Sequence, residues 1–217
     1  IVSYDLARLL GLFAAEGSYT KKDKKRSGII FSYSKDEQDL INETSNLLIK
    51  LFNKKPTINY TSNKCDLRVS SMKIAETFYN HVGEYSKEKT ISEKIVFNKD
   101  NEVKRQFILG WLEGDGSVDK LSGKVVGTTV SENMASQITL MLNSLNIQNS
   151  LFKYSESKSE IDNRLIDGGP GFRVKIPYNV AKTNFADLSK LNKFTKVVKE
   201  KVRSDFNNSY RFYKVLN

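Results

Sequence analysis

The sequence predicts an α+β fold made of two similar halves, each with the element order αββαββα. Three observations lead to this prediction. A nine-residue stretch at 9–17 is repeated at 108–116, with apolar residues, a glycine and a carboxylate at matching positions. Helical and strand-like patterns then follow each copy in the same order. The two carboxylates, Glu16 and Asp115, lie 99 residues apart in a chain of 217, which is typical of a duplicated unit.

The first half, residues 1–97, begins with apolar residues at helical spacing over 4–16, and Ser3 is the expected N-cap. Turn residues at Ser27-Gly28 and at 62–64 predict two hairpins. The expected elements are helices over 4–16, 35–52, 72–81 and 92–97, and hairpin strands over 19–25 with 29–34 and over 57–61 with 67–70.

The second half, residues 104–217, follows a polar linker at 98–103 and repeats this order. It differs mainly in one long loop, which contains Asp167-Gly168-Gly169-Pro170-Gly171 and separates two strands. The expected elements are helices over 106–115, 132–145, 179–188 and 193–204, and strands over 117–121, 124–129, 151–157 and 172–176.

The composition indicates a globular protein with a polyanionic partner. The net charge is +10 with a pI near 9.5, and the excess is shared, because residues 1–100 hold 17 Lys and Arg against 13 Asp and Glu while residues 101–217 hold 18 against 12. Two evenly basic halves fit a long surface laid along nucleic acid. The single cysteine, Cys65, and single histidine, His81, exclude a disulfide framework and a Cys/His zinc site within one chain. We expect no membrane segment and an intracellular protein, in the cytoplasm or in an organelle.

The repeated stretches predict a metal site between two helix ends. Small residues at Gly11, Ala14, Ala15, Gly110 and Gly114 would let the two helices approach closely. Two carboxylates at helix C-termini would then meet and repel each other, and a hard divalent cation such as Mg²⁺ would relieve that repulsion. One such helix alone would be an ordinary packed helix, but two matched copies favour metal-assisted hydrolysis of a phosphodiester.

Leu9–Gly17 and Ile108–Gly116 resemble the motif that names the LAGLIDADG homing endonucleases. Two departures are Ala14, which replaces the first acid of the motif, and Glu16, which stands where aspartate is commoner. The resemblance implies a saddle of two four-stranded antiparallel sheets straddling double-stranded DNA. It also implies a monomer with internal pseudo-twofold symmetry that uses Mg²⁺, or Mn²⁺ in its place, to cut both strands across the minor groove and leave 3′ overhangs.

The resemblance also implies roles for individual residues. The metal ligands would be Glu16 and Asp115, with the carbonyl groups of Ala15 and Gly114 beside them. Family members keep a basic residue near each scissile phosphate, and the segment 83–91 indicates Lys89 for this role, 73 residues after Glu16. Its counterpart is Lys190, 75 residues after Asp115, or Lys193, and each lysine could instead be a solvated surface residue. Polar residues that could organise water are Ser32 and Thr129.

Strand residues are expected to contact the DNA. Alternation puts one side of each strand on the duplex, where arginine and asparagine can read bases and most lysines contact phosphates. The candidates are Lys22, Lys24, Arg26, Asn59, Thr61, Lys64 and Arg68 in the first half, and Lys120, Lys124, Lys153, Ser155, Ser157, Arg173 and Lys175 in the second.

Two other functions fit the same sequence. The fold could belong to an RNA maturase or to a DNA-binding protein that has lost cleavage, although retention of both acids argues against loss of the metal site. The chain could also be a domain excised from an intein, because segment 83–91 looks like that subgroup. Self-splicing is not expected, since the chain has no splicing Cys or Ser near a start motif and no terminal His-Asn pair.

Overall fold

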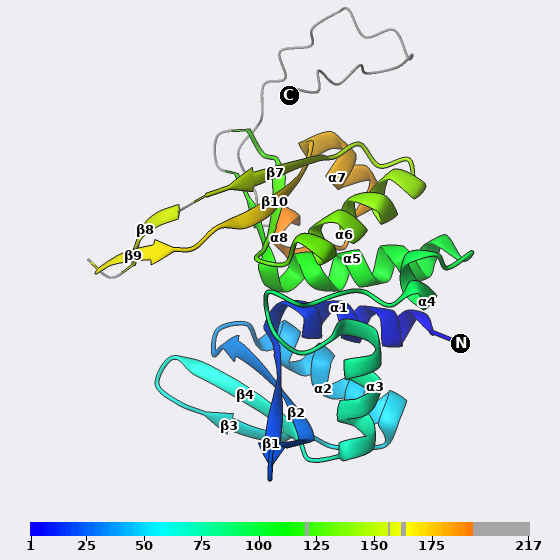
Figure 1. Cartoon of the computed structure of the whole chain (residues 1–217), viewed down its shortest axis with the longest axis vertical. Coiled ribbons are helices and arrows are strands. Elements are labelled where there is room, and N and C mark those ends of the chain that lie inside the picture. Colours follow the sequence, from blue (N-terminus) through cyan, green and yellow to red (C-terminus); the bar gives the residue numbers. More distant parts are fainter. Residues whose placement is uncertain (120–121, 156, 162–163, 193–217) are drawn as a thin grey trace, which may run out of the picture.

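The computed structural model describes residues 1–119, 122–155, 157–161 and 164–192. It contains two four-stranded antiparallel sheets, and α1 and α5 cross the middle of the molecule between them (Figure 1). The predicted α+β class with two similar sheets is confirmed. None of the helices in these residues is long and apolar enough to cross a membrane.

The first half contains four helices and one sheet among the described residues. Ser3 caps the first helix as predicted, because its hydroxyl oxygen accepts a hydrogen bond from the Leu6 N–H at 3.2 Å. The elements are α1 (Tyr4–Glu16), β1 (Gly17–Lys22), β2 (Lys25–Ser34), α2 (Gln38–Phe52), β3 (Thr57–Tyr60), β4 (Lys64–Val69), α3 (Met72–Val82) and α4 (Glu93–Val96).

The second half repeats this order and adds a ribbon. Its elements are α5 (Asn101–Asp115), β5 (Gly116–Val118), β6 (Val125–Thr129), α6 (Glu132–Ser144), β7 (Ser150–Tyr154), β8 (Ser157–Ile161), β9 (Arg164–Gly168), β10 (Gly171–Ile176), α7 (Tyr178–Asn184) and α8 (Ser189–Asn192). The sheet orders β1-β2-β4-β3 and β5-β6-β10-β7 correspond position by position, which makes the two halves pseudo-symmetric.

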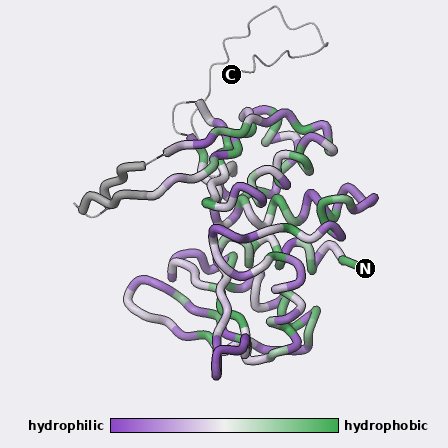
Figure 2. The backbone as a smooth tube through the Cα atoms, in the orientation of Figure 1, coloured by the Kyte–Doolittle hydropathy of each residue, from purple (hydrophilic) through white to green (hydrophobic). Residues whose placement is uncertain are grey.

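The two motif helices form the centre of the core, as their small residues predict. A Cβ atom added at Gly11 would lie 2.1 Å from the backbone oxygen of Phe107, and one at Gly110 would lie 2.3 Å from that of Arg8. Only glycine therefore permits this backbone contact between α1 and α5. Hydrophobic residues recur along both helices, whereas the outer hairpin turns are hydrophilic (Figure 2).

The first hairpin differs from its prediction. The turn is at Asp23-Lys24, where both residues have positive φ (51° and 63°), and not at Ser27-Gly28. Positive φ at both central residues is the requirement of a two-residue hairpin turn. Ser27-Gly28 instead forms a bulge, where the register changes from Thr20 opposite Gly28 to Lys21 opposite Arg26. The bulge therefore reverses the face of the sheet on which Arg26, the β2 residue before it, lies.

Three further elements differ from their predictions. The helix expected over 106–115 starts at Asn101, because the Asp100 carboxylate accepts the Glu102 N–H at 2.9 Å and caps it earlier. The helix expected over 35–52 starts at Gln38. The expected long loop of the second half contains the paired strands β8 and β9, which project as a ribbon beyond β7 and β10 (Figure 1). The helix expected over 193–204 lies outside the described residues.

Candidate active site

The two motif carboxylates end the two central helices. Glu16 is the last residue of α1 and Asp115 the last of α5, and each is followed by a glycine that starts a strand. Those glycines are extended (φ −94° and −86°), so the chain passes from helix to strand without a left-handed cap. A Cβ atom on Gly114 would lie 3.1 Å from Glu16 Oε1. The carboxylate of one motif therefore lies against the end of the other.

Both carboxyl groups are shifted toward their neutral forms. Burial, together with the charge of Asp115, raises the pKa of Glu16 to about 7. Burial likewise raises the pKa of Asp115 to about 6, against the opposing effects of nearby lysine charges and of the Trp111 N–H, which Asp115 Oδ2 accepts at 3.2 Å. The charged forms of these two adjacent carboxyl groups are both disfavoured, and a bound cation would stabilise them.

The two predicted lysines lie at the same helix ends. The Lys89 ammonium donates to the Ala14 carbonyl at 2.6 Å, and the Lys190 ammonium donates to the Gly114 and Gly116 carbonyls, both at 2.7 Å. Burial lowers the pKa of each lysine, while the nearby carboxylates oppose this effect. The structure thus brings together all four residues expected at the centre, and each ammonium group neutralises the negative end of a motif helix.

A cavity of about 220 Å³ opens beside this centre. Its lining joins Lys89 of the first half with Asp115, Thr128 and Tyr154 of the second half. Sequence reasoning did not single out Trp111, which lies four residues before Asp115 and therefore one helical turn away. That spacing is the signal that could have identified it as the partner of the carboxylate.

The donor set fits a divalent cation only in part. Two carboxylates and helix-end carbonyls supply the hard oxygen ligands that Mg²⁺ prefers. Among the described residues, however, no group of three or more His, Cys, Asp or Glu side chains could hold a metal. Of the two carbonyl groups expected as ligands, that of Gly114 accepts the Lys190 ammonium. A cation held by Glu16 and Asp115 would therefore require further ligands that are not side chains, such as water or phosphate oxygens.

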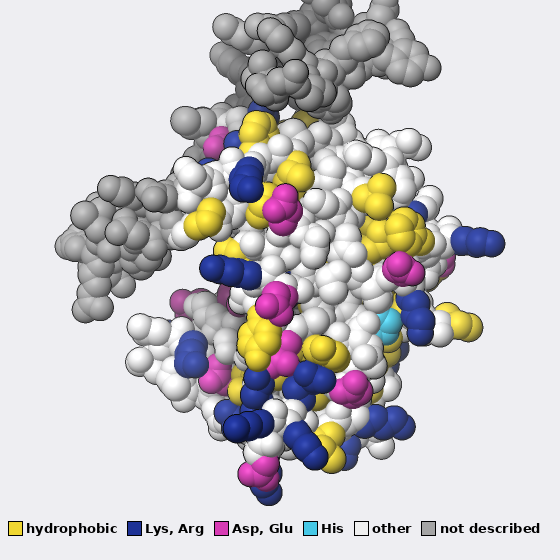
Figure 3. Space-filling model, viewed as in Figure 1, with side chains coloured by type: hydrophobic (Ala, Val, Ile, Leu, Met, Phe, Trp, Pro, Cys, Tyr) yellow, Lys and Arg dark blue, Asp and Glu magenta, His cyan; other side chains and the backbone are white. Residues whose placement is uncertain are grey.

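The first sheet presents an open face with several of the expected DNA contacts. Buried residues alternate with more exposed ones along β4, and Lys64 and Arg68 lie on the exposed side. Asn59 is exposed on β3 opposite Asp66 of that side. Figure 3 shows lysine and arginine side chains gathered over this half of the molecule. The other exposed candidates of this half, Lys22, Lys24 and Thr61, lie at the ends of strands or in turns.

Arg26 does not share that face. Its guanidinium group lies 2.9 Å from Glu84 and 3.5 Å from Glu76, and it stacks 3.5 Å from the ring centroid of Tyr79 on α3. The physical reason is the bulge at Ser27, because one extra residue moves Arg26 to the side that the helices cover. The expected water-organising Ser32 donates its hydroxyl to Asp66 at 2.7 Å.

The second sheet divides its candidates between two faces. Arg173 and Lys175 of β10 lie over aromatic rings, at 4.5 Å from the centroid of Tyr154 and 4.7 Å from that of Phe152. Lys153 is opposite Phe172 in the ladder and so lies on the other face. Lys124 and Ser155 are exposed near strand ends, and the hydroxyl of Thr129 accepts the Ser131 N–H at 3.2 Å. Lys120 and Lys193 lie outside the described residues, as does the side chain of Ser157.

The fold and the site together define a single chain of two similar halves, with one carboxylate and one lysine at each of two central helix ends. The family model of the LAGLIDADG-like domain matches residues 3–83 and 102–173, which is more than half of the chain. The chain therefore belongs to the LAGLIDADG family, and the resemblance found in the two motifs is confirmed.

Two curated relatives match most of this chain but only a small part of their own length. The ATP-dependent DNA helicase Hel308 of Thermococcus kodakarensis is 29% identical over 159 residues, which are 70% of this chain and 14% of the helicase. Uncharacterized protein MJ1054 of Methanocaldococcus jannaschii is 30% identical over 173 residues, which are 73% of this chain and 18% of that protein. The chain thus spans less than a fifth of the length of either relative.

Two solved structures show the same fold at low identity. The crystal structure of I-DmoI in complex with DNA and Ca has a TM-score of 0.58 and 17% identity, covering 86% of this chain and 90% of that one. Full-length DUF199/WhiA from Thermatoga maritima has a TM-score of 0.54 and 15% identity, covering 94% of this chain and 65% of that one. These similarities concern the fold, so the activity of this chain must be argued from its own site.

Proposed function

We propose that this chain is a divalent-metal-dependent endonuclease that cuts both strands of a specific DNA duplex. The observation that carries the proposal is the pairing of Glu16 with Asp115 at two adjacent helix ends, with the buried Lys89 at one end and the half-buried Lys190 at the other. Similar solved structures of I-DmoI contain target DNA together with Ca, Mn or Mg, which supports a divalent cation here.

The acidic and the basic residues of the site would have different roles. Glu16 and Asp115 would hold the cation, which we expect to be Mg²⁺ with Mn²⁺ as a substitute. When bound, such an ion polarises a phosphodiester and lowers the pKa of a water molecule. Lys89 and Lys190 would each stabilise the negative charge that develops on one scissile phosphate. Because the two halves are similar, the centre would cut both strands, and the family resemblance implies cuts across the minor groove that leave 3′ overhangs.

The open faces of the two sheets would hold the duplex. Asn59, Arg68 and Arg173 would contact base edges, and Lys22, Lys64 and Lys175 would contact phosphates. The net charge of +10 supports such a polyanion interface. Arg26 and Lys153 are left out of the proposed interface, because they lie on the opposite faces of their sheets.

A cleavage assay tests the proposal directly. The wild type is incubated with a duplex DNA library in Mg²⁺ or Mn²⁺, beside Glu16→Gln and Asp115→Asn. We expect specific double-strand cuts with the wild type alone, and unchanged DNA binding in the two variants. A wild type that binds duplex DNA but never nicks it would refute the endonuclease function.

That negative result would favour a second candidate, a DNA-binding protein or RNA maturase of the same fold. One contact supports this alternative: the Lys190 ammonium, 2.7 Å from the Gly114 carbonyl, takes a place expected for the metal. Binding of structured RNA in preference to duplex DNA would then identify the maturase.

A further inference from the structure

Each of the two lysines at the candidate active site belongs to a segment that a side chain from another helix helps to hold. Lys89 lies between α3 and α4 of the first half, in a segment that crosses the middle of the molecule (Figure 1). Lys190 lies in α8 of the second half. The contacts that fix these two segments differ in chemistry, and neither set takes part in the metal site itself.

The Lys89 segment is held by α6 of the second half. Gln137 pairs with the backbone of Ile91: its Oε1 accepts the Ile91 N–H at 2.7 Å, and its Nε2 donates to the Ile91 carbonyl at 2.7 Å. The hydroxyl of the fully buried Ser131, the N-cap of α6, donates to the Lys89 carbonyl at 2.5 Å. These contacts fix the backbone on both sides of Thr90.

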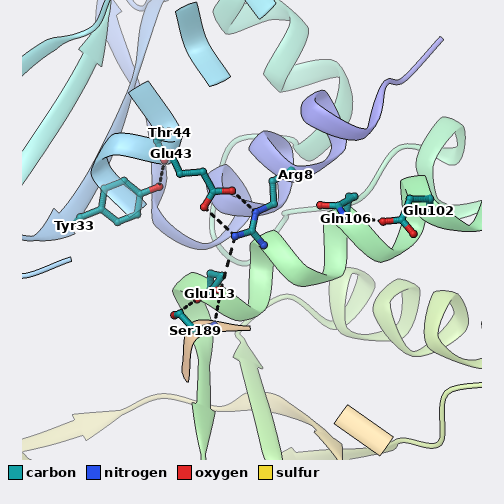
Figure 4. A network of polar contacts seen from close by, with 8 residues as sticks. All are labelled: Arg8, Tyr33, Glu43, Thr44, Glu102, Gln106, Glu113 and Ser189. Carbon is teal, nitrogen blue, oxygen red and sulfur yellow. Dashed lines mark hydrogen bonds and ion pairs between the residues drawn. The ribbon is translucent and has the colours of Figure 1, made fainter. Parts of the chain in front are cut away.

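The Lys190 segment is held by Glu113 of α5, which is only 2% exposed. This carboxylate accepts the Ser189 N–H at 2.8 Å and the Ser189 hydroxyl at 2.5 Å, immediately before Lys190. It also lies 3.8 Å from the guanidinium of Arg8, on α1 of the first half, which makes a two-point ion pair with Glu43 at 2.7 and 2.9 Å. Figure 4 shows this chain of contacts from α2 through α1 and α5 to α8.

Packing alone does not explain Glu113. The matching position of the first motif is Ala14, so a motif helix packs at this place without a carboxylate. A buried ion pair is costly compared with apolar side chains of similar size. Here the cost is not fully offset, since Arg8 Nη1 is buried and finds no hydrogen-bond partner among the described residues. What the carboxylate supplies, and an apolar side chain would not, is a fixed position for Ser189.

We infer that Gln137 and Glu113 are positioning residues that each hold one active-site lysine in place, Gln137 across the boundary between the halves and Glu113 within the second half. Gln137 acts on Lys89 and Glu113 acts on Lys190. The two lysines are thereby placed independently of each other. This inference rests on the proposed endonuclease function, because it predicts that each residue affects the cleavage of one DNA strand.

Strand-resolved cleavage tests the inference. A duplex carrying the cleavage site has a different fluorophore on each strand, and single-turnover rates are measured at saturating enzyme. Lys89→Met and Lys190→Met first show which strand depends on which lysine. We expect Gln137→Leu to slow the Lys89-dependent strand about tenfold or more, because small misplacements of catalytic groups are costly, and to leave the other strand within about twofold. Glu113→Leu, which removes both acceptor oxygens, should show the opposite preference.

Controls separate positioning from general damage. Gln137→Glu keeps the oxygen that accepts the Ile91 N–H and should recover part of the lost rate. Thr139→Val removes only a hydroxyl that donates to the Ala135 carbonyl within α6, so both strand rates should be unchanged. Hydrogen exchange without metal or DNA gives a second measurement: the Ile91 amide should exchange faster only in Gln137→Leu, and the Ser189 amide only in Glu113→Leu.

The outcomes distinguish the two proposals. A wild type without cleavage refutes the endonuclease function and, with it, this inference. A wild type that cuts, combined with variants that slow both strands equally or neither strand, overturns the inference alone. Unchanged exchange at Ile91 and Ser189 in the two variants would also overturn it, because the anchoring contacts would then not hold these segments.

Discussion

Replacing Asp115 by asparagine should stabilise the metal-free protein at neutral and higher pH. Burial at the helix end raises the pKa of Asp115 from 3.8 to about 6, so the folded state favours the protonated acid. The stability that this preference contributes is complete below about pH 4 and is lost as the pH rises through about 6. Asparagine keeps the shape and an oxygen that can accept the Trp111 N–H, but it carries no charge to bury.

The expected size of this effect comes from the pKa shift. About two pKa units correspond to about 3 kcal/mol at most, and screening by water reduces this, so we expect a gain of about 1–3 kcal/mol near pH 8. For a chain of this length the gain should raise Tm by about 2–10 °C. A divalent cation at about a thousand times its Kd should reverse the order, because it would stabilise the wild type by about 4 kcal/mol and the variant by much less.

Thermal unfolding of the metal-free proteins at about pH 4.5, 6 and 8 measures the effect. Asp36→Asn, which removes an exposed carboxylate in a turn, is the matched control and should change stability by less than about 0.5 kcal/mol. The reasoning would be refuted if Asp115→Asn were no more stable than the wild type near pH 8. A gain of the same size at every pH would refute it as well, because the cause would then not be the buried charge.

Other predictions concern the helix contact and the DNA face. Gly11→Ala and Gly110→Ala should each destabilise the fold by about 3 kcal/mol or more and abolish cleavage of both strands, whereas Gly169→Ala, with nothing within 4 Å of the added carbon, should be neutral by urea denaturation. DNA affinity should fall roughly a thousandfold between about 50 and 200 mM salt, and a flat dependence would contradict the basic interface. Lys22→Ala should lower the slope of that salt dependence by about one, while Arg26→Ala should cost about 1 kcal/mol of stability and leave the slope unchanged, as a titration of labelled duplex would show.

The sequence by itself determined the repeat, the class of fold and the residues at the centre. Helical spacing, the paired acids and the small residues of both motifs are local patterns, and they sufficed to place Glu16 and Asp115 at adjacent helix ends. The lysines followed from the family resemblance and the similar spacing from each acid, and the structure locates Lys89 and Lys190 at those ends. These features are predictable because each depends on residues that are close in the chain or repeated along it.

Only the tertiary structure decided which face each strand residue occupies and what holds the lysines. One bulge residue at Ser27 moves Arg26 away from the open face, since side chains alternate with a period of two and a single insertion reverses them. The contacts of Gln137 with Ile91 and of Glu113 with Ser189 join residues 46 and 76 positions apart. No periodicity or motif relates such residues, because the first pair meets only when the two halves pack against each other and the second only when α8 packs against α5.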